Sequence, residues 1–233
     1  MHIHRPKAPH DLRELLKEIG VIVIGIAIAL SGEQVLTALH WRLKVGRAEA
    51  NMRQQLNEDL AYAYEVQRLG PCTRTYFNLM EAAVLRNDWR LMSRLYALGP
   101  PFDLHPWRIT AWEGAVSGQV PDQLDVERLA AYGLAFHFVA TEQELQLAMN
   151  RHYAEAMTAR FPLPTSPQVT RQQLVAIALM KADQEKAIAV SSRLLTEFGR
   201  SLGVAPNAAM SAPYSQRARA CEAGLDQLST PPA

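Results

Sequence analysis

The stretch Ile19–Gly32 reads IGVIVIGIAIALSG and decides the architecture, because it is uncharged and consists largely of branched aliphatic residues. Apolar residues continue from there to Trp41, and Glu33 is the one acidic residue between. A helix needs about 20 mostly apolar residues to cross a bilayer core of about 30 Å. The run from Leu15 to Trp41 has that length, so we expect a transmembrane anchor helix over residues 11–45.

Two other interpretations of this segment stay open. The segment is also compatible with a buried core helix of a soluble protein, or with a cleaved signal peptide, since Ala27-Ile28-Ala29 resembles a small-residue cleavage site. We favour an uncleaved anchor because the apolar pattern continues past that tripeptide.

The orientation of the anchor is not decided by positive charge, because four basic residues stand on each side of it. They are Arg5, Lys7, Arg13 and Lys17 before it, and Arg42, Lys44, Arg47 and Arg53 after it. We expect the N-terminus in the cytoplasm, because the preceding tail is short and the large domain follows. The domain would then lie in the periplasm.

The stretch from Leu15 to Leu30 also carries a resemblance. It reads LLKEIGVIVIGIAIAL and resembles the opening of single-pass membrane proteins of proteobacteria. In these, an E-x-G-x-I-V-I-G-I-x-I-A-L helix precedes a helical domain of unknown function. The resemblance covers about the first forty residues and implies a bacterial inner-membrane setting, but it implies no activity.

The rest of the chain is typical of an all-α fold, because alanine and leucine dominate and alternating β-branched residues are scarce. We expect a flexible tail (1–10), the anchor (11–45), a helical domain (46–228) and a frayed tail (229–233). Beyond Gly46 the apolar pattern resumes, so the anchor should continue as a stalk until Gly70-Pro71 ends it.

A helical bundle with two long helices should follow the stalk. We expect short helices after Asn87-Asp88 and around Trp107 to Trp112. The long helices should run from Asp122 to Arg160, ended by Pro162 and Pro164, and from Ser166-Pro167 to Gly203. A linker over Pro206 to Pro213 and a terminal helix from Tyr214 to Leu228 complete the expected bundle.

Cys72 and Cys221 are the two cysteines, and each falls on the apolar face of its helix. In an oxidising periplasm two such cysteines pair readily, so we predict a disulfide between them. It would clamp the terminal helix to the start of the domain. Two independent buried thiols are the alternative, since free cysteine is commonly buried.

Two groups of residues are candidates for contacts with other molecules. Small residues on one face of the anchor permit close helix approach, and Glu33 adjoins that face; this helix-association set is Gly25, Ala29, Gly32 and Glu33. The densest aromatic and cationic cluster is Trp107, Arg108 and Trp112. Trp and Arg are enriched at binding hot spots, but we favour a structural role for this cluster.

Histidines give little support to a metal site. His2, His4 and His10 lie in the tail, and His105, His137 and His152 are far apart without a recognisable ligand pattern. Glu142 and Glu144 are interpreted as charges on a solvated helix face.

No catalytic or phosphate-binding motif is found, so we expect neither enzymatic activity nor a cofactor. A net charge of +1 provides no basic field for nucleic acid. We therefore expect a protein that acts in interaction or assembly, with membrane lipid and a protein partner or a second copy as its contacts. A periplasmic ligand-binding sensor bundle that signals through a partner is the alternative.

Overall fold

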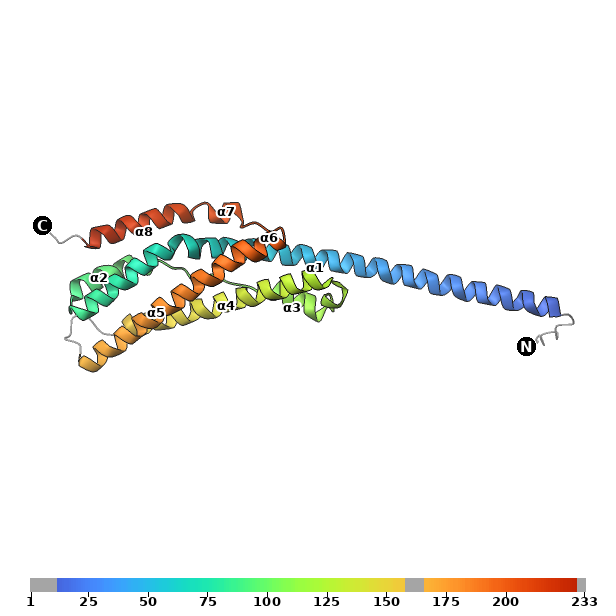
Figure 1. Ribbon diagram of the computed structural model, residues 1–233, viewed down its shortest axis with the longest axis horizontal. Helices are drawn as coiled ribbons and strands as arrows, with labels where there is room; N and C mark the ends of the chain where they lie inside the picture. The colour runs from blue at the N-terminus through green and yellow to red at the C-terminus, as the bar shows by residue number, and fades with distance from the viewer. Residues whose placement is uncertain (1–11, 158–165, 230–233) are drawn as a thin grey trace, which may run out of the picture. The chain divides into compact units, whose positions relative to one another are not determined.

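The computed structural model describes residues 12–157 and 166–229, and in these ranges every regular element is helical (Figure 1). The predicted all-α fold is therefore confirmed. The predicted flexible tail, residues 230–233 of the frayed tail, and the stops at Pro162 and Pro164 lie outside the described residues. The chain divides into two compact units, Met1–Arg47 and Ala48–Ala233.

The helices and helical turns are, in chain order, α1 (Leu12–Leu85), α2 (Trp89–Leu98), α3 (Thr110–Ser117), η1 (Pro121–Gln123), α4 (Val126–Met157), α5 (Pro167–Arg193), η2 (Leu194–Phe198), α6 (Gly199–Ser201), α7 (Ala208–Ser211) and α8 (Tyr214–Ser229).

In the first unit, α1 exposes its apolar side chains. Val21 is 72% exposed and Ile28 is 68% exposed, and none of the most apolar 18-residue window is buried. A core helix of a soluble protein would bury one face. This helix is long and apolar enough to cross a membrane, as predicted.

In the second unit, α1 does not end at Gly70-Pro71, so that prediction was wrong. Pro71 removes one helical hydrogen bond, yet α1 continues to Leu85 because α5 packs directly against it. A Cβ at residue 70 would lie 2.9 Å from Ile188 Cδ1, so glycine permits this close approach. The Gln67 side chain also donates a hydrogen bond to the Ile188 carbonyl.

Two short helices follow α1. Asp88 caps α2 by accepting a hydrogen bond from the Leu91 amide at 3.0 Å, and Gly99, with φ of +77°, ends it. The start of α2 agrees with the prediction from the sequence. α3 begins only at Thr110, so Trp107 lies in the preceding loop and not in the helix predicted around it.

The predicted pair of long helices is present as α4 and α5, which lie side by side in Figure 1. The first begins later than predicted, because Pro121–Gln123 forms a separate helical turn and Asp125 then caps α4 at the Arg128 amide. Ser166 caps α5 as predicted. After Arg193 the helix widens into the π-helical turn η2 before α6.

The last helix, α8, runs beside α1 in the same direction. The Asn207 amide donates to the Asn57 carbonyl at 2.9 Å, and further along Cys221 pairs with Cys72. The predicted linker between α6 and α8 contains the short helix α7, capped by Asn207. The core joins α1, α2, α4, α5 and α8 through buried residues that include Tyr76, Phe77, Met80, Leu95, Ile177, Met180 and Leu225.

Candidate functional site

The most elaborate polar cluster of the second unit surrounds Glu65, a buried carboxylate on α1. Its side chain is only 2% exposed. Arg217 Nη1 of α8 lies 2.7 Å from Glu65 Oε1, and His105 Nε2 lies 2.5 Å from Oε2. The contact with His105 is not aligned as a hydrogen bond, so Oε2 has no hydrogen-bond donor among the described residues. A buried charge needs such partners because desolvation is costly.

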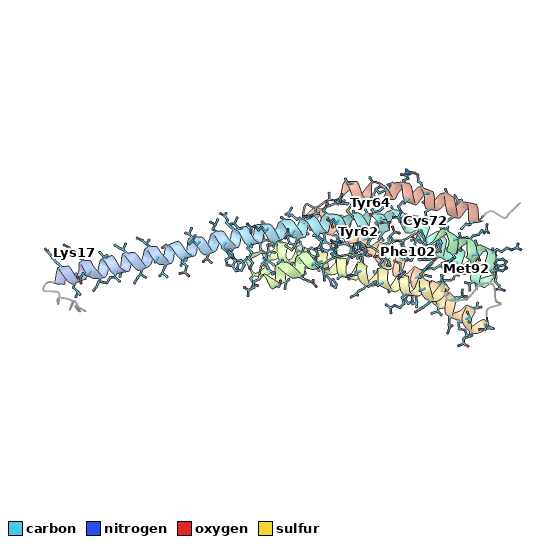
Figure 2. The ribbon with its side chains drawn as sticks, turned by 180° about the vertical axis from the view of Figure 1, so that it is seen from behind. Lys17, Tyr62, Tyr64, Cys72, Met92 and Phe102 are labelled. Atoms are coloured by element: carbon cyan, nitrogen blue, oxygen red, sulfur yellow. A yellow bond between two sulfur atoms is a disulfide. The ribbon has the colours of Figure 1, made fainter. Side chains whose placement is uncertain are left out.

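The loop between α2 and α3 carries two members of this cluster, Asp103 and His105. Gln146 of α4 holds the loop in place. Its Oε1 accepts hydrogen bonds from the His105 amide at 2.9 Å and from Trp107 Nε1 at 3.0 Å, while its Nε2 donates to the Asp103 carbonyl. Tyr62 stacks on the His105 imidazole, with 4.2 Å between ring centroids (Tyr62 is labelled in Figure 2). Gln146 therefore fixes the backbone of the loop, and packing against Tyr62 fixes the His105 ring.

Arg217 bridges the two carboxylates of the cluster. Its Nη1 lies 2.7 Å from Glu65 Oε1 and also 2.7 Å from Asp103 Oδ2. Burial lowers the pKa of Arg217, but the two carboxylates outweigh burial and raise it. Burial raises the pKa of the neighbouring Tyr214, and so do the negative charge of Glu65 and a side-chain hydrogen bond to it.

The geometry of this cluster suits a metal ion. One ligand atom from each of Glu65, Asp103 and His105 can be chosen so that all three lie within 4.8 Å of one another. A cavity of about 20 Å³ adjoins these side chains. Sequence reasoning set His105 aside because no acidic pattern surrounds it. Asp103, two residues from His105, was the one neighbouring acid that the sequence could have pointed to. Glu65 lies on α1, far from His105 in the sequence.

Burial separates the three members of the predicted interaction patch. Trp107 is 3% exposed and bonded to Gln146, and Trp112 stacks on Phe136 with ring centroids 6.1 Å apart. Arg108 is exposed. Its amide donates to Asp59 Oδ1. Trp107 is thus buried and Trp112 half-buried in the packing of the domain, and a contact of this cluster with a partner stays a prediction.

Asp59 and Gln55 of α1 hold the start of α3 in place. Gln55 Oε1 accepts from the Ala111 amide at 2.8 Å, and Gln55 Nε2 donates to the Arg108 carbonyl. Burial raises the pKa of Asp59 from 3.8 to about 7, against the lowering effect of the Arg108 amide. Asp59 is therefore a buried carboxylate that changes charge near neutral pH.

Glu142 was predicted to lie on a solvated face, and that prediction was wrong. Its side chain is 1% exposed between α4 and α5 and accepts a hydrogen bond from Ser191 Oγ. Burial raises its pKa from 4.5 to about 8, although the Ser191 hydrogen bonds lower it in part. Glu144 is exposed as predicted. Position 142 lies on the face of α4 that packs against α5. Because the residue there is charged, the sequence pattern did not reveal that this position is buried.

The Cys72–Cys221 disulfide is confirmed, with 6.2 Å between the Cα atoms. That distance lies within the range of about 4.4–6.8 Å that the bond requires. Cys72 follows Glu65 by two helical turns on α1, and Cys221 follows Arg217 by one turn on α8. The bridge therefore also helps to keep Arg217 beside Glu65.

The helix-association set of α1 is exposed as well. A Cβ at Gly25 or Gly32 would meet nothing within 4 Å, and Ala29 and Glu33 are exposed. These residues are therefore accessible to another helix, and their role in helix association stays a prediction.

Of the other histidines, His152 contacts Glu155 and Asp183, while His137 contacts Phe138. His2, His4 and His10 lie outside the described residues.

Comparison of this chain with protein families, with curated proteins and with solved structures finds no match.

Proposed function

We propose that this chain is a single-pass bacterial inner-membrane protein whose helical domain lies in the periplasm and binds another protein, as an accessory subunit of a membrane complex. Two features support the location. The apolar part of α1 exposes its side chains, and the domain holds a disulfide, a bond that persists in oxidising compartments.

The binding role rests on one observation, the outer face of α2. Leu91, Met92 and Leu95 bury the inner face of this helix. Trp89 and Tyr96 form a stripe that flanks this inner face, and their side chains are 49% and 63% exposed.

Arginines complete this outer face. Arg90 and Arg94 are exposed on α2, and Arg86 is exposed just before it. Arg90 lies over the Trp89 ring at 5.6 Å, and none of the three arginines has an ion pair with a described residue. We define Arg86, Trp89, Arg90, Arg94 and Tyr96 as the α2 surface. Exposed Trp, Tyr and Arg are the residues that contribute most to protein-binding hot spots.

The charge of the α2 surface identifies the chemistry of the partner. Three guanidinium groups that form no ion pair with a described residue complement an acidic protein surface, where arginine forms bidentate contacts with carboxylates.

Site-specific photo-crosslinking in cells that produce the full chain tests this proposal. A photoreactive residue replaces Ala97, which is exposed on α2. We expect a protein adduct that is lost in an Arg90→Glu/Arg94→Glu variant and retained in an Arg200→Glu/Arg219→Glu control. The crosslinked peptide should be acidic, and a lysine introduced there should restore the adduct with the charge-reversed α2.

Three results would each overturn the binding role of the α2 surface: no adduct, a lipid adduct, or an adduct indifferent to the charge reversal.

A periplasmic ligand-binding sensor bundle is the second candidate function, and one observation favours it. An open hollow of about 490 Å³ is bounded by Glu155, Arg171, Gln172, Val175 and Ala176 of α4 and α5. Small organic acids are the natural class to screen, because Arg171 is exposed there. A rise in melting temperature that an Arg171→Ala variant loses would support the sensor, and no rise for any compound would count against it.

A further inference from the structure

We propose that Glu65, Asp103 and His105 bind a divalent transition-metal ion, for which Zn²⁺ is the suitable probe. This site goes beyond the proposed binding role of the α2 surface. It joins one residue of α1 with two residues of the loop that precedes α3. One imidazole nitrogen and two carboxylate oxygens form a ligand set that suits zinc and related ions better than Mg²⁺ or Ca²⁺.

The strongest single indication is the unsatisfied oxygen of Glu65. Its side chain is 98% buried, and Oε2 points into the cluster without an aligned hydrogen-bond donor. Buried polar atoms in native proteins nearly always have a partner, so each exception needs an explanation such as an ion. A metal ion bound by Oε2 would supply that missing partner once the His105 imidazole moves back from its 2.5 Å contact with this oxygen.

Space for an occupant is present beside these ligands. The cavity of about 20 Å³ is lined by Glu65, Asp103 and His105, together with Gln146. A site of roughly 10–15 Å³ is enough for one water molecule, so one ion or one ion-bound water fits. The cavity is too small for an organic ligand.

Coordination requires His105 Nε2 to move away from Glu65 Oε2, because the two atoms are only 2.5 Å apart. Two ligands at about 2.0–2.1 Å from zinc in tetrahedral geometry lie about 3.3 Å apart. The three ligand atoms already lie within 4.8 Å of one another. Gln146 fixes the loop through its hydrogen bonds to His105 and Asp103, which is the supporting role that residues around metal ligands commonly have.

Arg217 acts as a built-in competitor of the metal ion. Its guanidinium lies 2.7 Å from one oxygen of Glu65 and 2.7 Å from one oxygen of Asp103. It neutralises part of the negative charge that attracts a metal ion, and the Cys72–Cys221 bridge holds it nearby. A metal ion therefore binds more tightly when this positive charge is removed. A purely structural ion-pair network would show no such gain in metal affinity.

Isothermal titration of the full chain with Zn²⁺ in detergent tests the site. All variants carry alanine at His2, His4 and His10, so that the tail provides no second site. We expect one Zn²⁺ per chain and a rise in melting temperature. Affinity should fall at least about tenfold in Asp103→Asn and in His105→Ala, and it should rise about tenfold in Arg217→Gln. Mg²⁺ at the same concentration should give no signal.

His137→Ala is the matched control, because this histidine is exposed on α4 and should leave Zn²⁺ binding unchanged. Circular dichroism of each variant checks that it folds, and the exposed Asp103 provides a ligand whose loss disturbs packing least. Absence of binding in the parent chain would overturn the proposal, and so would binding in Asp103→Asn or His105→Ala that is as tight as in the parent chain. So would weaker binding in a folded Arg217→Gln variant.

Discussion

Replacement of Glu142 by glutamine should change how the stability of the domain depends on pH. Glu142 is buried between α4 and α5, and burial raises its pKa from 4.5 to about 8. Between these values the folded chain holds a proton that the unfolded chain has released. The proton therefore stabilises the folded state fully below about pH 4.5, and this contribution is lost as the pH rises through about 8.

The size of the effect follows from the two pKa values. At 1.36 kcal/mol per pKa unit, the full contribution is about 5 kcal/mol, of which about 4 kcal/mol disappears between pH 5 and pH 9. Glutamine has nearly the same shape, can accept the Ser191 hydrogen bond and carries no titratable proton. The Glu142→Gln variant should therefore lose less stability over this range than the native chain does.

Urea unfolding of both proteins in detergent, followed by tryptophan fluorescence at several pH values, measures this difference. As the pH rises from 5 to 9, the free energy of unfolding of the native chain should decrease by several kcal/mol more than that of the variant. A Glu144→Gln control, at an exposed position two residues away, should follow the native chain. If the stability difference between Glu142→Gln and the native chain does not vary with pH, then Glu142 does not hold its proton and the reasoning fails.

Three further changes test other parts of the domain. Cys221→Ser should lower the melting temperature with little change in helix content, because the 149-residue separation makes the bridge worth up to about 5 kcal/mol by chain entropy; equal melting under oxidising conditions would refute this. Asp59→Asn should reduce the loss of stability as the pH rises from about 4 to 7, because burial raises the pKa of Asp59 to about 7; urea unfolding at both ends of that range measures it. Gly70→Val should destabilise the domain by about 1–3 kcal/mol through a clash with Ile188. A Gly114→Val control meets no neighbour within 4 Å, so a similar loss in both would contradict close packing at Gly70.

Much of the fold could be predicted from local signals. Asp88, Gly99 and Ser166 mark helix ends through their own capping chemistry, which needs no knowledge of distant residues. The apolar faces around Cys72 and Cys221 were enough to predict the disulfide.

The errors arose where a distant element overrides the local pattern. Gly70-Pro71 is a strong local stop signal, but α5 packs so closely there that α1 continues. Glu142 was assigned to solvent because it is charged, although Ser191 of another helix provides its buried partner.

The cluster around Glu65 was beyond local reasoning for the same physical cause. Its four members, Glu65, Asp103, His105 and Arg217, come from α1, from the loop before α3 and from α8, and Arg217 stands 152 residues from Glu65. Only folding brings these groups together, so neither spacing nor composition reveals them. His105 alone gave no reason to expect a ligand set.

Alkaline carbonate extraction of membranes from cells that produce the full chain tests the anchor most directly. The native chain should remain in the membrane pellet, because the apolar part of α1 is long enough to cross the bilayer. An Ile24→Arg/Ile28→Arg variant should move to the supernatant, since each central arginine costs about 2.5–3.5 kcal/mol. Release of the native chain by carbonate would contradict the membrane anchor and with it the account of this protein.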